Sequence, residues 1–446
     1  MRRTIAGPLA ALITLLALLA APAHAQAQTT AGYRIDERTC DGYPRLPIGM
    51  ADGMCAGLVY TVPPGARPQT GIGFPRTVLE LPDGDILIVA MGGWRPGVGS
   101  VWRLSNRPGR TPGLRRLLNG LSMPHLAAFG PDGRLYLGEM NRIIRFDPDA
   151  ADPAASVETV IDNLPSNQLH ANRHPLSAFL FDADGSLILN VGAPTDQCAA
   201  PAPRPGTPCA EAVGSHAAAA LWRYRYLGQG RWNRQPTVLA TGLRNSMAIA
   251  RHATGAIFQA ENSIDLASEN SPFEELNLIA EGGAYGWPYC MDIRTPTPAW
   301  RGTGIMDCAS AAHTAPIMLL APHGAPLSML YYDGPMFPQL QGRLLISLHG
   351  FRPTGGRIMA YEVGKTGAPI LTGTATYPVY RAGAGPIRRR FPERGATGLN
   401  LTPNWDAVPG TRPMGRPVGL MVARDGALWV ADDRNGTIIR IAADRR

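Results

Sequence analysis

The sequence predicts an all-β protein, a six-bladed β-propeller built from four-stranded antiparallel blades. Three observations support this fold class. The chain is rich in Gly and Pro, with 51 and 42 of them among 446 residues. Six similar turns are spread along the chain, each followed by a short apolar strand, and further strand-like segments follow most of them. Gly and Pro interrupt helices and separate short strands, and a hydrophobic content of 45% suffices for a large core.

The six turns are the main evidence for a repeat. A Gly tolerates positive φ and a preceding Asp caps the turn, so Asp-Gly between apolar runs indicates a β-hairpin. The turns are Asp83-Gly84, Asp132-Gly133, Asp184-Gly185, Thr254-Gly255, Gln341-Gly342 and Asp425-Gly426. The strands that follow them read DILIVA, RLYLGE, SLILNV, AIFQAE, RLLISL and ALWVAD. The shortest interval between turns is about the length of a four-stranded blade.

A ring of blades explains this spacing better than a β-sandwich or a solenoid. Radial packing leaves few exposed strand edges, and the longer intervals can hold insertions, at about 194–219, 284–322 and 364–415. We therefore assign residues 73–446 to the propeller. Residues 26–72 form an irregular N-terminal segment, which could supply an outer strand that closes the ring or simply pack against it.

Residues 1–25 are predicted to be a signal peptide. Arg2 and Arg3 form a basic start, an apolar run follows to Leu19, and Ala23-His24-Ala25 is a small-x-small cleavage pattern. The run is short for a membrane anchor, and no later segment is long and apolar enough to span a bilayer. We expect cleavage near Ala25 and a periplasmic or secreted protein with no membrane span.

The six cysteines fit an oxidising compartment. An even number in an exported chain favours disulfides, whereas zinc, the competing interpretation, lacks a CxxC spacing and paired His. The expected partners are sequence neighbours: Cys40 with Cys55, Cys198 with Cys209, and Cys290 with Cys308.

The formal charge of +8 comes from scattered basic residues. The exception is Arg388-Arg389-Arg390, with Arg381 and Arg394 nearby. No nucleic-acid module is present, and an exported protein seldom meets nucleic acid, so no such partner is expected. A small anionic ligand or an anionic surface suits this charge, with a solvated loop as the alternative for the triple arginine.

The residues just before each inner strand should line one mouth of the propeller, where loops on a rigid scaffold commonly carry function. Several of them are cationic or imidazole side chains: Arg76, His125, His174, Arg244, His323 and Arg416. This clustering indicates an anionic ligand. A structural network from Arg to backbone carbonyls is the alternative.

Several longer motifs extend the pattern: LATGLRNSMAIA, ENSID, FEELNLIAEGGAYGWPYC, HGAPLSMLYYDG, GRLLISLHG and GRPVGLMVARDGALWVADD. With these motifs, the chain from about residue 73 to its C-terminus resembles the soluble quinoprotein glucose/sorbosone dehydrogenases. Members of that family are exported six-bladed propellers that use pyrroloquinoline quinone (PQQ) and calcium.

The resemblance implies roles for particular positions. His174, rather than His170, falls on the general base, which takes the hydroxyl proton of a sugar while hydride passes to the quinone. Other positions match residues that bind the cofactor, whose three carboxylates suit arginine: Arg244, Asn245 and Arg416, with His349 standing where glucose-type members have Lys.

The resemblance also implies a calcium site. Ca²⁺ takes oxygen ligands, including backbone carbonyls. The resemblance implies them in the loop Asn262, Ser263 and Ile264 and in the Glu274 carboxylate, with Asp265 as the alternative acidic ligand. Glucose-type members have Gly-Pro at Ser263-Ile264, so this loop departs from them. The alternative for Glu274 and Glu275 is a surface pair bonded to turn backbone.

A second departure concerns the histidine. The family aspartate that orients it aligns with Ala193, and Asp196 could substitute. The expected function is oxidation of an aldose or sorbosone-like sugar aldehyde, with electrons passed to a soluble acceptor. The alternatives are a calcium-dependent six-bladed lactonase or other hydrolase, whose site would need Glu, Asn and Asp around calcium, and a catalytically degenerate sugar-binding propeller.

Overall fold

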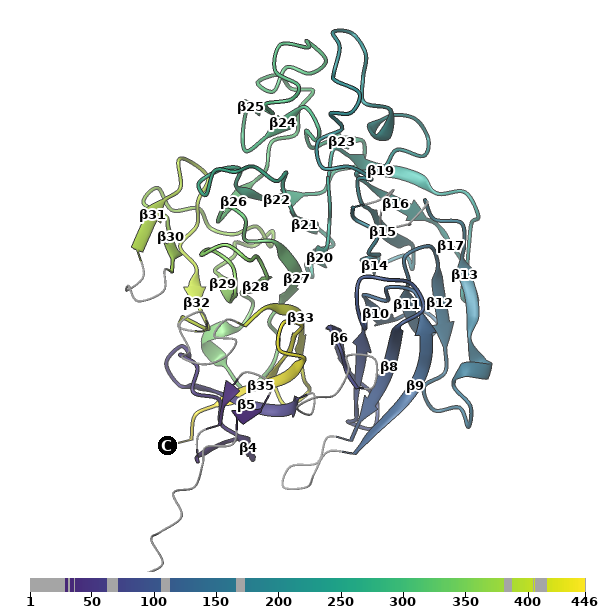
Figure 1. Ribbon diagram of the computed structural model, residues 1–446, viewed down its shortest axis with the longest axis vertical. Coiled ribbons are helices and arrows are strands. Elements are labelled where there is room, and N and C mark those ends of the chain that lie inside the picture. Colours follow the sequence, from purple (N-terminus) through teal and green to yellow (C-terminus); the bar gives the residue numbers. More distant parts are fainter. Residues whose placement is uncertain are drawn as a thin grey trace, which may run out of the picture.

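The computed structural model describes residues 29–30, 33–35, 37–61, 71–105, 113–165, 173–380, 387–403, 405 and 415–445. The predicted signal peptide, His170 and Arg381 lie outside these residues. Six antiparallel sheets are arranged around a common axis (Figure 1), which confirms the predicted six-bladed propeller. The described helical structure consists of three short 3-10 turns, Ala154–Ser156, Ala210–Ala212 and Pro338–Leu340.

Each blade has an inner strand, two middle strands and an outer strand. Blades 1 to 3 contain β6 (Pro75–Glu80), β7 (Ile86–Ala90), β8 (Gly99–Leu104), β9 (Leu114–Leu121); β10 (Ala127–Phe129), β11 (Leu135–Gly138), β12 (Ile143–Phe146), β13 (Glu158–Ile161); and β14 (Phe179–Phe181), β15 (Leu187–Val191), β16 (Ala220–Tyr224), β19 (Thr237–Thr241). Blades 4 to 6 contain β20 (Ala248–Arg251), β21 (Ile257–Glu261), β22 (Glu274–Leu278), β26 (Met318–Leu320); β27 (Pro326–Tyr331), β28 (Leu344–Leu348), β29 (Arg357–Tyr361), β32 (Leu399–Asn400); and β33 (Pro417–Val422), β34 (Leu428–Asp432), β35 (Thr437–Ala443), β5 (Met54–Thr61).

The six predicted turns all join the inner strand of a blade to the next strand. Their glycines all have positive φ, between 74° at Gly342 and 91° at Gly255. Gly426 also has no room for a side chain, because a Cβ there would lie 2.3 Å from the Met336 nitrogen. The turns are therefore fixed by the conformational freedom of glycine.

The N-terminal segment closes the ring. β5 pairs antiparallel with the last strand, β35, in a register that runs from Thr61 opposite Thr437 to Met54 opposite Ala443. Figure 1 shows the two strands side by side, although they come from opposite ends of the chain. Of the two roles considered for residues 26–72, the structure shows the first, an outer strand.

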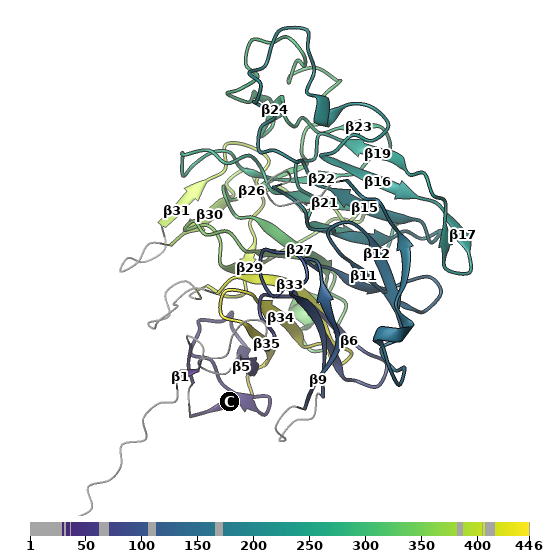
Figure 2. The ribbon, with the colours of Figure 1, turned by 45° about the vertical axis from the view of Figure 1, so that its right-hand side comes forward.

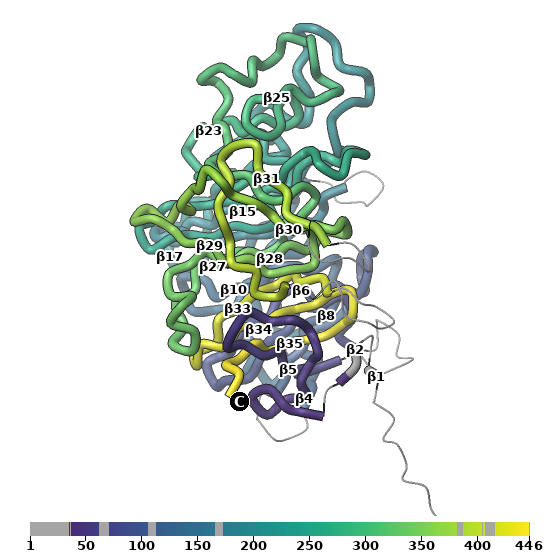
Figure 3. Tube along the Cα trace, turned by 90° about the vertical axis from the view of Figure 1, so that its left-hand side faces the viewer, coloured from purple at the N-terminus to yellow at the C-terminus, as the bar shows by residue number. Residues whose placement is uncertain are grey.

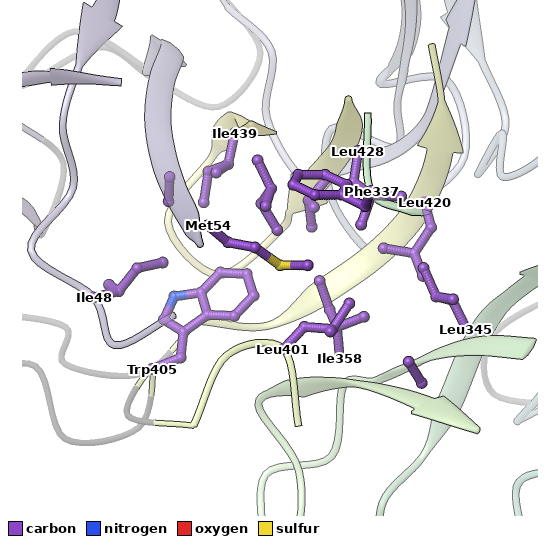
Figure 4. Close-up of a cluster of buried hydrophobic side chains, with 14 of the residues drawn as sticks. Ile48, Met54, Phe337, Leu345, Ile358, Leu401, Trp405, Leu420, Leu428 and Ile439 are labelled. Atoms are coloured by element: carbon purple, nitrogen blue, oxygen red, sulfur yellow. The ribbon is translucent and has the colours of Figure 1, made fainter. Parts of the chain in front are cut away.

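Apolar side chains fill the wedges between neighbouring blades. Figure 4 shows the cluster between blades 5 and 6, in which Trp405 is 1% exposed and packs near Met54 and Leu401. Burying such side chains contributes about 1.5–3 kcal/mol each, so the blades are held together by their facing surfaces. This gives the loops at either end of the ring a rigid support.

Two insertions project from the same end of the ring (Figure 2). One follows β15 in blade 3 and contains the disulfide Cys198–Cys209; the other follows β22 in blade 4 and contains Cys290–Cys308. The third predicted disulfide, Cys40–Cys55, ties β5 to the segment before it. All three expected cysteine pairs are thus confirmed. The insertions contact each other, since the Tyr289 hydroxyl accepts the Cys209 N–H at 3.0 Å.

Short accessory strands complete the fold. β23 (Gly283–Ala284) lies parallel to β19 at the edge of blade 3. The remaining two-stranded pairs are β1 (Thr29–Thr30) with β2 (Tyr33–Arg34), β3 (Thr39–Cys40) with β4 (Tyr43–Pro44), β17 (Tyr226–Gly228) with β18 (Arg231–Trp232), β24 (Cys290–Met291) with β25 (Thr295–Pro296), and β30 (Thr376–Val379) with β31 (Ile387–Arg390). Among the described residues, no helix has the length and apolar character needed to cross a membrane.

Candidate functional site

The residues that precede the inner strands lie on one face of the ring, which we call the mouth face. In three blades, such a residue is bonded to the end of the second strand of the same blade. The N–H of His125 donates to the Gly138 carbonyl at 3.0 Å. Those of Arg244 and Arg416 donate to the carboxylates of Glu261 and Asp432, at 3.0 and 2.9 Å. The six turns lie on the opposite face.

One group of charged side chains on the mouth face surrounds Asp433, and we call it the Asp433 cluster. The guanidinium of Arg76 donates to Asp433 Oδ2 at 3.0 Å, and His349 Nε2 lies 2.8 Å from Oδ1. Arg416 also acts on this carboxylate electrostatically. These residues come from blades 1, 5 and 6, and none is more than 9% exposed.

The carboxylate of Asp433 is held ionised by its cationic neighbours. Burial raises the pKa of Asp433, but His349, Arg76 and Arg416 outweigh burial and hold that pKa below its ordinary value. A second buried carboxylate, that of Asp432, accepts the N–H of Arg416 beside it. Near Asp433, burial and then the charge of Arg76 lower the pKa of His125 well below its ordinary value, so its imidazole is neutral.

Two nitrogens of this cluster are buried without a hydrogen-bond partner among the described residues, Arg76 Nε and His125 Nδ1. Buried polar groups are nearly always paired in folded proteins, so unpaired ones need an explanation. These two nitrogens mark a place where a hydrogen-bonding ligand would be stabilised.

Two exposed aromatic rings cover the arginines of this cluster. The guanidinium of Arg76 lies 5.6 Å from the centre of the Trp94 ring, and that of Arg416 lies 5.2 Å from the Phe351 ring. Trp94 is 48% exposed and Phe351 is 68% exposed. Large exposed apolar groups beside buried cations are typical of binding surfaces for flat, charged ligands.

A second group, the His174 cluster, comes from blades 3 and 4. Nδ1 of His174 lies 2.5 Å from the carbonyl oxygen of Ala193. A carbonyl can only accept, so Nδ1 carries the proton and Nε2 is the acceptor nitrogen. The loss of solvation around the ring, and then the charge of Arg244, lower the pKa of His174 to about 3. The ring is therefore a neutral base over the whole physiological range of pH.

Ala193 thus contributes its backbone where the related family uses an aspartate side chain. The approach is close: a Cβ on the preceding residue, Gly192, would lie 2.6 Å from the His174 Cβ. Asp196, which could have substituted for the missing side chain, instead forms an ion pair with Arg244.

Arg244 is buried and holds two loops together. Its Nη2 lies 2.6 Å from Asp196 Oδ1, its Nε donates to the Asp196 carbonyl at 3.2 Å, and its Nη1 donates to the Asn262 carbonyl at 2.8 Å. Asn245 follows directly. Its carbonyl accepts the Asn262 N–H at 3.2 Å, and its side-chain oxygen accepts from Asn190 at 3.4 Å.

The loop after β21 carries the predicted calcium ligands. The two carboxylate oxygens of Glu274 accept the backbone N–H groups of Ser263, at 2.6 Å, and Ala325, at 2.9 Å. Burial raises the pKa of Glu274 to about 7. A calcium ion bound by Glu274 would have to displace at least one of these hydrogen bonds.

The backbone of this loop and the burial of its neighbours distinguish between the expected calcium site and the alternatives to it. Within the described part of the chain, the carbonyl oxygens of Ser263 and Ile264 accept no hydrogen bond, which leaves both oxygens open to a cation. Glu274 and Glu275 are each 4% exposed, so they are not a surface pair, although Glu274 does bond loop backbone as that alternative expected. His323, another predicted mouth residue, binds the carbonyl of Ser268 at 2.7 Å and belongs to neither cluster.

The two clusters border one apolar floor. This floor consists of Met91, Met123, Met140, Leu176, Ala178 and Met247, with Phe74 and Leu327 packed against it. From the Asp433 cluster, Arg76 Nη2 contacts the Met91 sulfur at 3.5 Å. On the other side, Asn190, the partner of Asn245, contacts the Met247 sulfur at 3.7 Å. The structure therefore places His174, Arg244 and Asn245 together, and His349 with Arg416 across the floor from them.

Sequence reasoning missed three residues of this region, Asp433, Trp94 and Phe351. All three lie in the loop after the second strand of a blade, the same position as Asp265 and Asp196. The available signal was their place in the repeat: Phe351 and Asp433 directly follow SLHG and WVAD, and Trp94 follows VAM after two glycines. Their partners come from other blades, so the repeat alone did not pair them.

Comparisons with known proteins concern the family and the fold. The family model described as TrAA12-like matches residues 70–444. A calcium structure of the Trichoderma reesei carbohydrate-active enzyme of family AA12 is 18% identical, with a TM-score of 0.65 over 91% of this chain and 98% of that chain. The holo form of the pyranose dehydrogenase PQQ domain from Coprinopsis cinerea is 18% identical, with a TM-score of 0.62 over 91% and 99%.

The PQQ-bound aldose sugar dehydrogenase of Streptomyces coelicolor is 16% identical, with a TM-score of 0.52 over 89% of this chain and 100% of that chain. At such identities, these solved structures show a shared fold. A comparison with curated proteins by sequence found no match.

Proposed function

The chain belongs to the TrAA12-like family, and on that premise we propose that it is a PQQ-dependent sugar dehydrogenase. Its substrate would be an aldose or a sorbosone-like sugar aldehyde, and a soluble acceptor would take the electrons. The observation that carries this proposal is the Asp433 cluster, in which the Asp433 carboxylate contacts both Arg76 and His349 beside the buried guanidinium of Arg416.

That cluster fits the proposed cofactor. PQQ is flat and carries three carboxylates, which match the planar donors of arginine. Arg416 and His349 would hold it on one side of the apolar floor, and Arg244 and Asn245 on the other. Trp94 and Phe351 offer aromatic faces beside the cations. Bound PQQ would supply an electrophilic quinone that accepts hydride from the sugar carbon.

His174 is the proposed general base. Its Nδ1–H is committed to the Ala193 carbonyl, so Nε2 is the nitrogen that would take the hydroxyl proton from the substrate. The lowered pKa keeps this nitrogen unprotonated. A backbone carbonyl fixes the tautomer but adds no negative charge, so the imidazolium formed during turnover is less stabilised than it would be beside an aspartate.

Calcium is the second proposed cofactor. The carbonyls of Ser263 and Ile264 would be its protein ligands, with the Glu274 carboxylate as the acidic member of the set. Oxygen donors of this kind suit Ca²⁺, which would polarise the quinone as a Lewis acid. The open carbonyls support this assignment, and the two hydrogen bonds of Glu274 make it the weakest member.

The hydrolase alternative would need Glu, Asn and Asp around calcium. The one group of three His, Cys, Asp or Glu side chains among the described residues whose ligand atoms lie close together is Cys198, Cys209 and Glu211. Its two cysteines are joined by a disulfide, so this group is not a metal site.

We also propose that residues 1–25 are removed on export, which would place the enzyme in the periplasm or outside the cell. N-terminal sequencing of protein recovered from the extracytoplasmic fraction should begin just after Ala25. A protein that stays in the cytoplasm with Met1 intact would overturn this assignment.

The reaction is tested by reconstitution. Purified protein is mixed with PQQ and Ca²⁺, the cofactor spectrum is followed, and aldoses are added with a reducible dye. Dye reduction that requires both PQQ and Ca²⁺ supports the proposal, with Mg²⁺ in place of Ca²⁺ as the matched control. Failure to bind PQQ, or lactone hydrolysis with calcium alone, would refute it.

A further inference from the structure

A second candidate site lies on the outer side of blades 4 and 5. It belongs to neither cluster, but one of its lining residues, Phe273, directly precedes Glu274, and its carbonyl accepts the Ser263 hydroxyl at 2.6 Å. An open hollow of about 520 Å³ is lined by Asn270, Phe273, Tyr377, Arg389, Arg390, Phe391 and Pro392. Residues of β31 and those just after it form one wall, and the end of the loop before β22 forms the other. Figure 3 shows the β30–β31 hairpin on the outside of the ring, in front of β28 and β29.

Three aromatic rings give the hollow a fixed apolar wall. Phe273, Tyr377 and Phe391 pack against one another with ring centres 4.8 to 6.0 Å apart. The first two are at most 9% exposed and belong to a buried cluster that includes Leu319 of β26. The wall is therefore anchored in blade 4 and does not depend on a ligand for its shape.

The charge of the hollow comes from arginines. Arg389 and Arg390 line it, and neither forms an ion pair with a described residue. Arg388, the preceding residue, is not part of the lining and donates instead to the hydroxyl of Thr376 at 3.3 Å. Two uncompensated guanidiniums therefore lie beside an aromatic wall and the side-chain amide of Asn270.

We propose that this hollow binds a saccharide carrying a carboxylate, such as a uronic acid residue. A guanidinium matches a carboxylate with two parallel hydrogen bonds. The C–H face of a pyranose ring is apolar and can pack on the aromatic wall. The Asn270 amide can both donate to and accept from sugar hydroxyls. An acidic peptide would satisfy the arginines but would leave the aromatic wall uncovered.

The site would use Arg389 and Arg390, which belong to neither cluster, so this proposal does not rest on PQQ binding. The site would hold the protein on an acidic polysaccharide while the mouth face remains accessible. A site of this kind depends on a specific contact between carboxylate and guanidinium in addition to the general positive charge of the hairpin. The two contributions can be separated, because Arg388 carries the same charge on the same strand outside the hollow.

The test is calorimetric titration of the full-length protein with tri-galacturonate, and with neutral maltotriose and tri-glutamate as comparison ligands. Tri-galacturonate should bind and the other two should not. Replacing both lining arginines (R389A/R390A) should weaken binding by about tenfold or more, as expected when charged hydrogen bonds are lost. Arg388→Ala should leave the affinity unchanged, and circular dichroism should show that all variants are folded.

Three results would overturn the proposal. Equal binding of tri-glutamate would make the site a general anion or peptide surface. An equal loss in the Arg388 variant would reduce the effect to long-range attraction, which salt would screen. No binding of tri-galacturonate to the folded wild-type protein would leave the hollow without its proposed ligand.

Discussion

The imidazole of His174 is held by the main-chain carbonyl of Ala193, which remains whatever side chain stands at position 193. The carbonyl of Ala193 fixes which ring nitrogen carries the proton, which is one part of what an aspartate does for a catalytic histidine. The other part, stabilising the charged imidazolium, is missing here. This separation of roles makes the residue suitable for a mutational test.

His174→Ala should lower kcat by about 10²- to 10⁴-fold, the usual contribution of a positioned general base, while PQQ affinity stays unchanged. Steady-state kinetics and a PQQ titration measure the two quantities. His252→Ala is the matched control, because His252 lies at a turn on the opposite face and bonds to Thr254. Full turnover in the His174 variant would contradict its assignment as the base.

The pH dependence of activity follows from the lowered pKa of His174, about 3. An ordinary histidine would gain a proton near pH 6.5 and stop acting as a base. We therefore expect kcat/KM to stay level between pH 7 and pH 5. An enzyme whose base was an ordinary histidine would lose activity over this range. A decline with an apparent pKa near 6.5 would show that the ring is solvated and the assignment of its environment wrong.

The free energy of unfolding, unlike the activity, should fall as the pH is lowered. Below about pH 6.5, the unfolded chain protonates His174 and the folded chain does not, so the unfolded state binds more protons and folding weakens as pH falls. His174→Gln should therefore lose less stability than wild type between pH 7 and pH 4. Urea unfolding at several pH values measures this, and parallel curves for the two proteins would contradict it.

At the level of elements, the insertion after β15 supports the mouth face through Asp196. Its carboxylate pairs with Arg244 and accepts the Asp265 N–H at 3.1 Å, and its carbonyl accepts the Trp287 indole N–H at 2.8 Å. One residue thus connects the insertions of blades 3 and 4 with the loop after β21. The nearby disulfide, Cys198–Cys209, restricts the same segment.

Asp196→Ala should lower the free energy of unfolding by about 3 kcal/mol, because it leaves Arg244 buried without its counter-ion. Asp265→Ala is the control. Its carboxylate lies 3.6 Å from Arg244 but is 64% exposed, and exposed pairs contribute about 0–1 kcal/mol. Urea denaturation of both variants measures the difference. Equal costs would show that Asp196 is not the residue that holds Arg244.

At the level of the whole molecule, ring closure depends on a strand from the other end of the chain. Without β5, the edge of β35 and the apolar cluster around Met54 would be exposed, which favours aggregation. A variant lacking residues 1–61 should therefore be insoluble or unfolded by circular dichroism, whereas one lacking only residues 1–25 should fold. A folded, monomeric protein without β5 would contradict this account of closure.

Much of this architecture could be predicted from local sequence. The six turns depend on a glycine and its neighbours, and the three disulfides join cysteines at most 18 residues apart. The role of β5 remained open, because a short strand does not reveal its partner. Likewise, the repeat placed Arg76 and Arg416 on the mouth face, and the resemblance implied His349. None of these could be paired from the sequence with Asp433, which is 357 residues from Arg76.

The His174 cluster shows that a contact made by the backbone is not visible in an alignment of side chains. Aligning Ala193 with an aspartate suggested a weakened base or a substitute at Asp196, since sequence comparison considers side chains. The contact that replaces the aspartate is made by the backbone, and its geometry depends on the close approach permitted by Gly192. Asp196 was identified as important, but its partner is Arg244.

We expect one flat anion to bind on the mouth face between the two clusters. A crystal structure of the protein with PQQ and Ca²⁺ should show a single quinone over the Met91–Met247 floor. This quinone should contact Arg244 on one side and Arg416 on the other, with His174 Nε2 facing the substrate space. A quinone bound elsewhere, or touching only one of the two arginines, would contradict this expectation.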